Sequence, residues 1–243
     1  MGPPNTLPFP SAPTEIADLY PESDGKPMAE TERHFREILK NFNRLENHFA
    51  HIPDVYVLGD MMMYYKEGNP RKSISPDIFV TFGIGKKERR IYKIWEEGKP
   101  PDFVLEFASK GTYRTDLTRK VQLYAEIGIS EYFLYDVDRR YLPTPLMGFR
   151  LIGHEYVEIL ALPNGGIPAA TLGLEFHLLE DSFDIYDPES EAWLKTSDER
   201  AEDADERAED AKDRANQEAT ARQKAEAEVA RLQAELERLK TRR

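Results

Sequence analysis

Two apolar segments that each begin with Pro-Asp constrain the fold of this 243-residue chain more than any other feature. They are residues 76–80, which read PDIFV, and residues 101–109, which read PDFVLEFAS. Successive side chains of a strand point to opposite faces, so Glu106 shares a face with Asp102, opposite the phenylalanines. A glutamate in so apolar a strand is costly to bury unless it is paired or binds a metal. The pattern therefore predicts a functional Glu106, unless the strand lies at a sheet edge and Glu106 faces solvent.

The remaining periodicities predict an α/β or α+β protein whose mixed β-sheet is flanked by helices. Apolar residues at three- and four-residue steps predict an amphipathic helix between residues 35 and 52. A second helix is expected over residues 116–127 and should end at Gly128. Strands are expected at 54–65, 74–82, 102–108 and 131–136, with shorter ones at 148–152 and 155–160. Helices that alternate with strands in this order are typical of a mixed sheet.

Composition divides the chain into three parts. Residues 1–27 hold seven of the 17 prolines and predict an extended or disordered arm. Residues 28–190 form the expected folded domain, and the 40% hydrophobic content of the chain supports a substantial core. Residues 191–243 are expected to form a C-terminal coiled-coil helix.

Several classes of protein are excluded by what the sequence lacks. The chain has no cysteine, which excludes disulfides, thiol catalysis and any zinc site with cysteine ligands. No stretch of about 18 apolar residues is present, so no membrane association is expected. The N-terminus also has no basic segment followed by an apolar one, which argues against a secretory signal. These observations predict a soluble protein of the cytoplasm.

The tail carries a regular heptad pattern without glycine or proline. Its a and d positions are Ala201, Ala204, Ala208, Ala211, Ala215, Glu218, Arg222, Ala225, Val229, Leu232, Leu236 and Leu239. Ten of these twelve residues are apolar, which predicts a coiled coil and hence a homo-oligomer, expected to be a dimer. Thr196 and Glu199 have the spacing of a capping box at its start. The alternative is a single charged helix held by local ion pairs, and the pattern leaves strand number and direction open.

A lysine lies on the side of the second helix that should be buried. With Leu117 placed at zero and roughly 100° added per residue, Lys120 falls at about 300°, inside the apolar arc. A buried lysine needs an anionic partner, unless its stem packs and its ammonium reaches solvent. The sheet beneath this helix carries Glu106 and, we expect, Asp77. Two carboxylates with one lysine are the groups needed for metal-assisted phosphodiester hydrolysis, with Mg²⁺ or Mn²⁺ as the ion.

Five sequence runs, taken in this order, resemble the Uma family of restriction-endonuclease-like proteins. They read GDMMMYYKEGNPRKSISPDIFVTFG, PDFVLEFASKGT, DLTRKVQLYAEIGISEYFLYDVDRR, YVEI and LGLEF. The resemblance covers residues 54–189, and some members of the family carry a similar helical tail. It implies a PD-(D/E)XK nuclease fold, in which a mixed sheet is flanked by helices. Asp77 matches the Asp of the motif and Glu106 its second acid.

The match departs from the superfamily pattern at the lysine. The usual position, two residues after the second acid, is Ala108 here, and the resemblance implies that the basic residue has moved to the next helix, where Lys120 lies. Asp60 matches a recurrent Gly-Asp and is implied as a further metal ligand, unless it only caps a bend. Asp102 is a further candidate ligand, unless it only starts its strand.

The same motif includes an acid carried by a helix. The resemblance implies that this acid is Glu30, Glu32 or Glu37, without choosing between them. His48 and His51 have a spacing that is compatible with a metal, but no third ligand is near them in the sequence.

Two functional hypotheses follow, together with a weaker third. The first is a Mg²⁺-dependent endonuclease that acts on DNA. The second is a nuclease fold without catalysis that serves as a binding or scaffold module and assembles through its coiled coil. The lost strand lysine favours the second, as does a net charge of −12, from 33 basic and 45 acidic residues, since phosphate contacts need Lys and Arg. DNA affinity should therefore be low. A sugar hydrolase with two carboxylates is the third, and no aromatic-rich cleft supports it.

Overall fold

The computed structural model describes residues 19–23, 25 and 31–240, which form two separate units. The first unit is Met1–Leu194 and the second is Lys195–Arg243. The predicted arm over residues 1–27 lies mostly outside the described residues. Within it, Tyr20 packs edge-to-face on Tyr64 at a centroid distance of 4.9 Å, and its hydroxyl accepts the backbone N–H of Gly68 at 2.8 Å. This described part of the arm is therefore held against the first unit.

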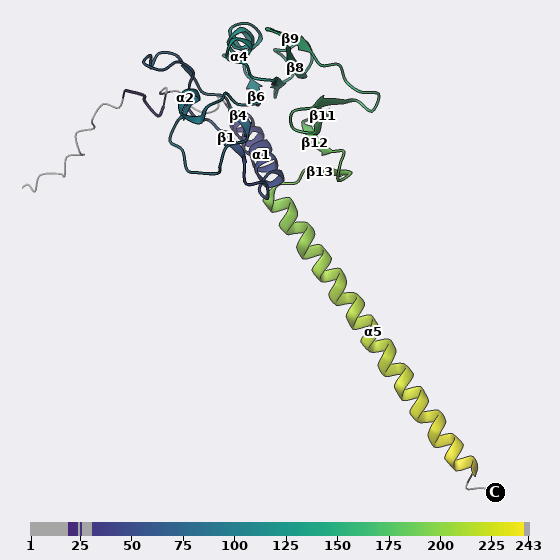
Figure 1. Ribbon diagram of the computed structural model, residues 1–243. Helices are drawn as coiled ribbons and strands as arrows, with labels where there is room; N and C mark the ends of the chain where they lie inside the picture. Colours follow the sequence, from purple (N-terminus) through teal and green to yellow (C-terminus); the bar gives the residue numbers. More distant parts are fainter. Residues whose placement is uncertain (1–18, 24, 26–30, 241–243) are drawn as a thin grey trace, which may run out of the picture. The chain divides into compact units, whose positions relative to one another are not determined.

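A six-stranded mixed sheet forms the centre of the first unit (Figure 1). Its strands, in spatial order, are β1 (Val55–Gly59), β4 (Ile78–Phe82), β6 (Phe103–Ala108), β7 (Glu131–Asp136), β8 (Leu146–Ile152) and β9 (Glu155–Glu158). All neighbouring pairs are antiparallel except β6 and β7, which run parallel. A parallel pair needs a crossover connection, so the chain must pass over the sheet between these two strands. The predicted mixed sheet and the α/β class are confirmed.

The crossover contains the predicted second helix, which begins earlier and is less regular than expected. It consists of α3 (Tyr113–Thr115), the π-helical turn η1 (Asp116–Lys120) and α4 (Val121–Ile127). Gly128, with φ 85°, ends it in the left-handed region, as predicted. The helix therefore lies directly above the two central strands that it connects.

Two smaller sheets and a helix complete the first unit. The second sheet contains β10 (Gly166–Ala169), β11 (Leu174–Leu178), β12 (Phe183–Asp187) and β13 (Ala192–Trp193), and the third contains β3 (Ser73–Ile74), β2 (Met63–Tyr64) and β5 (Tyr92–Lys93). Helix α1 (Glu32–His48) is capped by Thr31, and a short α2 (Ile94–Glu97) follows β5. The sequence did not predict the second sheet, because its strands are short and mix polar with apolar residues.

Alternation along the central strands separates two cores, one on each face of the sheet. Phe103, Leu105 and Phe107 of β6 pack with α1 and the second sheet. Val104 packs on the other face, with Tyr124 of α4 and with the third sheet. Glu106 shares this second face. The face of α1 that is buried differs in part from the expected one, because Phe35 and Leu39 are exposed while Ile38 and Leu45 are buried.

The second unit is a single uninterrupted helix, α5 (Ser197–Lys240), which confirms the long C-terminal helix (Figure 1). The predicted capping box starts it: the N–H of Glu199 donates to the hydroxyl of Thr196 at 3.2 Å, and the N–H of Thr196 donates to the Glu199 carboxylate at 2.7 Å. No helix among the described residues is both long and apolar enough to cross a membrane.

Candidate active site

Strand register places Asp77 directly beside Glu106. Strands β4 and β6 pair antiparallel from Ile78 opposite Leu105, and Asp77 lies one residue beyond this pair. The backbone N–H of Asp77 points at Oε2 of Glu106 at 3.4 Å, and the N–H of Phe107 donates to Oδ2 of Asp77 at 2.7 Å. The carboxylate of Asp77 thus takes the place of a ladder partner where the pairing between the two strands stops.

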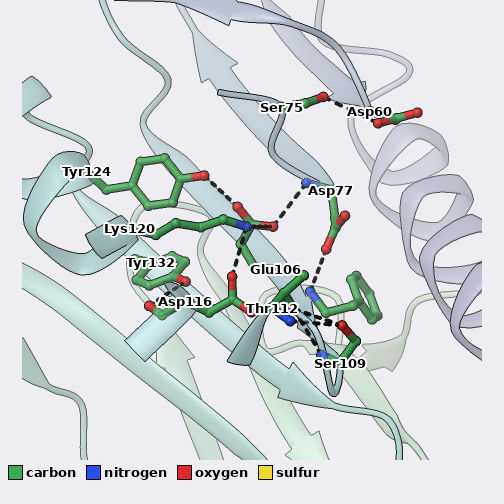
Figure 2. Close-up of polar contacts among 11 residues, drawn as sticks. Asp60, Ser75, Asp77, Glu106, Ser109, Thr112, Asp116, Lys120, Tyr124 and Tyr132 are labelled. Carbon is green, nitrogen blue, oxygen red and sulfur yellow. Dashed lines mark hydrogen bonds and ion pairs between the residues drawn. The ribbon is translucent and has the colours of Figure 1, made fainter. Parts of the chain in front are cut away.

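The crossover helix brings Lys120 onto Glu106 and onto a third acid, Asp116. Its ammonium lies 2.9 Å from Oε2 of Glu106 and 2.9 Å from Oδ1 of Asp116 (Figure 2). The side chain of Lys120 is only 15% exposed, and those of Glu106 and Asp116 are 1% exposed. The predicted meeting of Asp77, Glu106 and Lys120 in one place is thus present in the structure, and the ammonium does not point into bulk water.

Asp116 is a member of this cluster that the sequence analysis missed. It starts the π-helical turn that Lys120 ends, and such widened turns are frequent at functional sites. The signal was present in the sequence, because on the helical wheel that singled out Lys120 the Asp116 position falls only about 40° from the lysine. Because Asp116 is acidic, it was interpreted only as the first residue of the helix.

Tyr124 and Tyr132 surround the acids from the same side of the sheet. The hydroxyl of Tyr124 donates to Oε1 of Glu106 at 2.5 Å, and the hydroxyl of Tyr132 donates to the backbone oxygen of Asp116 at 3.1 Å (Figure 2). Both rings are fully buried. Tyr124 therefore fixes one oxygen of Glu106, and the other oxygen faces Lys120 and Asp77.

The cluster holds more negative charge than its lysine can neutralise. Burial and the charge of Glu106 raise the pKa of Asp77 well above its ordinary value, although Lys120 opposes this. Burial likewise raises the pKa of Asp116, again against Lys120. Burial alone would lower the pKa of Lys120, but the charges of Glu106, Asp116 and Asp77 outweigh it and raise that pKa. Three carboxylates and one ammonium leave a formal excess of two negative charges, which a divalent cation would balance.

Two further predicted ligands, Asp102 and Asp60, have other side-chain partners, although the backbone N–H of Asp60 donates to the carbonyl oxygen of Asp77 at 3.2 Å. The carboxylate of Asp102 accepts hydrogen bonds from Lys99 and from the backbone N–H of Phe82, at 2.7 and 2.8 Å. It shares a face with Glu106, but four residues of strand separate the two by about 13 Å. Asp60 is exposed, with φ 44°, and accepts a hydrogen bond from the hydroxyl of Ser75 at 3.3 Å (Figure 2). It forms the expected bend after Gly59.

The three glutamates considered as the helix-borne acid are Glu30, Glu32 and Glu37. Glu30 lies outside the described residues. Glu32 is an exposed partner of Arg36 in the first turn of α1. Glu37 is half-buried on α1, whose buried residues pack on the opposite face of the sheet from Glu106. Neither of the two described glutamates joins Asp77 and Glu106.

Two carboxylates of the cluster could hold a divalent cation. Across the described residues, no three His, Cys, Asp or Glu side chains are grouped as a complete metal cage, and His48 and His51 belong to no such group. Lys120 separates Asp116 from Asp77 within the cluster. Mg²⁺, however, usually binds through one or two carboxylates and completes its shell with water and substrate phosphate. Asp77 and Glu106 fit that requirement, and their excess charge favours it.

The fold and this site define an α/β protein with a buried carboxylate–lysine cluster on a mixed sheet. The profile of the Uma2 family, described as "Putative restriction endonuclease", matches residues 20–179. The chain therefore belongs to the Uma2 family, as its sequence resemblance indicated. No curated protein matches the chain.

One solved structure that resembles this chain is a nuclease described as putative, of the DUF820 group, from Anabaena variabilis ATCC 29413. The two chains are 16% identical, with a TM-score of 0.45 over 60% of this chain and 76% of the other.

Proposed function

We propose that this protein is a divalent-metal-dependent endonuclease that hydrolyses DNA phosphodiester bonds at the cluster of Asp77, Glu106 and Lys120. The observation that carries the proposal is the 2.9 Å contact of the Lys120 ammonium with Glu106, in a buried site where negative charge remains in excess. A purely structural ion pair would need one acid for the lysine, whereas three acids surround this one.

Each residue has a distinct task in this reaction. Asp77 and Glu106 would hold a Mg²⁺ or Mn²⁺ ion, which when bound polarises the phosphate and lowers the pKa of an attacking water. Lys120 orients the water or stabilises the charge that develops on the phosphoryl oxygens. Tyr124 keeps Glu106 in place by holding Oε1, so that Oε2 stays directed at Asp77 and Lys120. Asp116 holds the lysine from its other side.

The raised pKa of Asp77 supports a cation site. A carboxyl group whose charge is disfavoured by burial and by a neighbouring acid is relieved either by a proton or by a metal ion. Metal binding must then displace the proton. We therefore expect Mn²⁺ affinity to rise with pH above the ordinary pKa of the aspartyl group.

DNA affinity should be modest, because several basic side chains already have structural tasks. Lys86 donates to the carbonyl oxygens of Phe49 and Ala50 after the end of α1, at 2.7 and 2.8 Å. Arg89 forms a buried ion pair with Glu97 at 2.8 Å. In a protein of net charge −12, these groups add little to phosphate binding.

The test is nicking of supercoiled plasmid by the full chain with Mg²⁺, with Mn²⁺ and with EDTA. Asp77→Asn should abolish nicking and weaken Mn²⁺ binding measured by calorimetry. Asp102→Asn is the matched control, because it makes the same change at the other Pro-Asp, where the carboxylate is bound by Lys99. It should leave both readouts unchanged. Loss of nicking in both variants would return Asp102 to the ligand set, and full nicking by Asp77→Asn would reject the site.

The scaffold hypothesis makes the opposite prediction. It is favoured by the acidic charge and by Ala108 at the strand position where the superfamily carries its lysine. A protein of this kind would bind no Mn²⁺ at Asp77 and would nick no DNA with either metal, while its tail still assembled. The calorimetric measurement separates the two hypotheses even when no cleavage is seen.

A further inference from the structure

Helix α5 carries an apolar stripe that no described part of the chain covers. Every described side chain from residue 204 to 234 is exposed, and Val229, Leu232 and Leu236 are each more than half exposed. Aliphatic side chains at a and d positions along one face of a 44-residue helix need a partner helix to be buried. The sequence pattern alone left the direction of that partner open.

The apolar positions on either side of residue 220 are complementary in size. Before residue 218 the a and d positions are alanines, and after residue 225 they are valine and leucine. In an antiparallel pair centred at 220, each a position faces a d position of the other copy, and their residue numbers sum to 440. Ala208 then faces the partner's Leu232, and Ala211 faces the partner's Val229. The layers outside residues 215–225 therefore each combine a small and a large side chain, whereas Ala215 faces the partner's Ala225 next to the centre.

A parallel pair would lack this match. It would place Ala208 against Ala208 at one end and Leu232 against Leu232 at the other, so that the helices would have to diverge along the pair. The alanine layers would also bury little apolar surface.

The two charged residues at a and d positions, Glu218 and Arg222, distinguish the antiparallel from the parallel pair more strongly. In the antiparallel pair, Glu218 at a d position faces the partner's Arg222 at an a position, and the reverse pair lies beside it. In a parallel pair Glu218 would face Glu218 and Arg222 would face Arg222, which places like charges in the interface. In the single helix Arg222 pairs with Glu226 at 2.8 Å, but both side chains are mostly exposed, so exchanging that pair costs little.

Charges beside the seam agree with the same direction. The g positions hold Arg207 and Arg214 before the centre and Glu228 after it. An antiparallel pair brings g positions together, so arginine meets glutamate. A parallel pair brings Arg207 to Lys212, which repels it, and Arg200 to Asp205, which attracts it, so the flanking charges favour the antiparallel direction less strongly than Glu218 and Arg222 do. Glu228 pairs within its own helix with Arg231, again at an exposed position.

From this complementarity we infer that two copies of this chain associate through antiparallel α5 helices centred on Thr220. Glu218 of each copy pairs with the partner's Arg222. This inference is independent of the proposed catalysis, because it rests on the tail alone.

Charge exchange in the full chain tests the direction. Glu218→Arg should weaken dimerisation about tenfold or more in a dilution series followed by light scattering, because it places like charges in both central layers. The double variant Glu218→Arg with Arg222→Glu should restore the wild-type dissociation constant. Lys224→Glu makes the same change of charge as Arg222→Glu at an outward c position, and it should have no effect. A parallel pair predicts that Glu218→Arg changes nothing, and that result would overturn the inference.

Cross-linking gives a second test, since the chain has no cysteine of its own. Ala208→Cys and Leu232→Cys should each give little disulfide-linked dimer alone, but their co-expressed mixture should give abundant dimer under mild oxidation. Efficient cross-linking of either variant by itself would demonstrate a parallel pair. A monomeric wild-type mass at high concentration would also reject the inference, since no second copy would then cover the stripe.

Discussion

Two glutamates lie on neighbouring strands of the same sheet, are equally buried, and have opposite surroundings. Glu131 of β7 accepts hydrogen bonds at Oε1 from Arg150 at 2.8 and 2.9 Å and from the N–H of Ala170, and at Oε2 from the N–H of Thr171. One cation and two backbone groups satisfy one carboxylate. Glu106 of β6 shares its lysine with two other acids. Burial alone therefore does not identify a functional carboxylate, whereas uncompensated charge around it does.

The two glutamates also connect different parts of the structure. Glu131 joins β8 to the segment after β10, and so it connects the central sheet to the second one. Glu106 joins two strands to the crossover helix and leaves charge available for a ligand. This contrast predicts that matched substitutions at the two sites change the free energy of unfolding by different amounts and with different signs.

The largest difference in stability should come from removing the cationic side chains of Lys120 and Arg150. Lys120→Met leaves three acids in a buried site without a counter-charge, and we expect a loss of about 3–5 kcal/mol in the free energy of unfolding. Arg150→Met should cost about 1–2 kcal/mol, because Glu131 keeps its backbone donors and Arg150 is 42% exposed. Urea denaturation of both variants checks this order, and equal losses would remove the distinction between the sites.

Neutralising the two glutamates should change the stability of the protein in opposite directions. Glu131→Gln weakens hydrogen bonds to a charged acceptor and should destabilise the protein by about 1.5–3 kcal/mol. Glu106→Gln lowers the number of acids around Lys120 from three to two and should leave stability unchanged or raised, while nicking is lost. The same denaturation series provides the comparison. A destabilisation of Glu106→Gln as large as that of Glu131→Gln would mean that Glu106 is a structural residue.

The smallest effect should be the pH-dependent gain in thermal stability that Asp77→Asn produces. Because the folded-state pKa of Asp77 is raised, the folded protein binds more protons than the unfolded chain above pH 3.8, so stability falls as pH rises from there. Asparagine has no such penalty. The variant should melt higher than wild type at pH 8, by roughly 2–4 °C for each kcal/mol relieved, and the gain should shrink toward pH 4. Calorimetric melting at both pH values measures it, and a gain that grew as pH fell would contradict the raised pKa.

The central part of this arrangement could be predicted because it depends on short-range rules. Alternation along β6 set Glu106 apart from its apolar neighbours, and helical periodicity placed Lys120 toward the sheet. Both inferences need only the geometry of one element. The mixed sheet and the Gly128 helix end followed from equally local signals.

Several features of the structure depend on contacts that no single element reveals. Asp102 shares a face with Glu106, but facing the same way does not bring two side chains together when four residues of strand separate them. Asp116 was missed because acidic residues are common in the first turn of a helix, although its position on the helical wheel lies near that of Lys120. Phe35 and Leu39 are apolar yet exposed, because the packing of α1 against the second sheet selects a neighbouring face. That sheet was itself not predicted.

The length of α5 has a consequence for the distance between the two points at which the paired helices begin. In the antiparallel arrangement the two copies of Ser197 lie at opposite ends of the paired rod, about 70 Å apart at 1.5 Å per residue. That span equals roughly 20 base pairs of B-form DNA. The antiparallel pairing would thus separate the starting points of the two helices by about two turns of duplex.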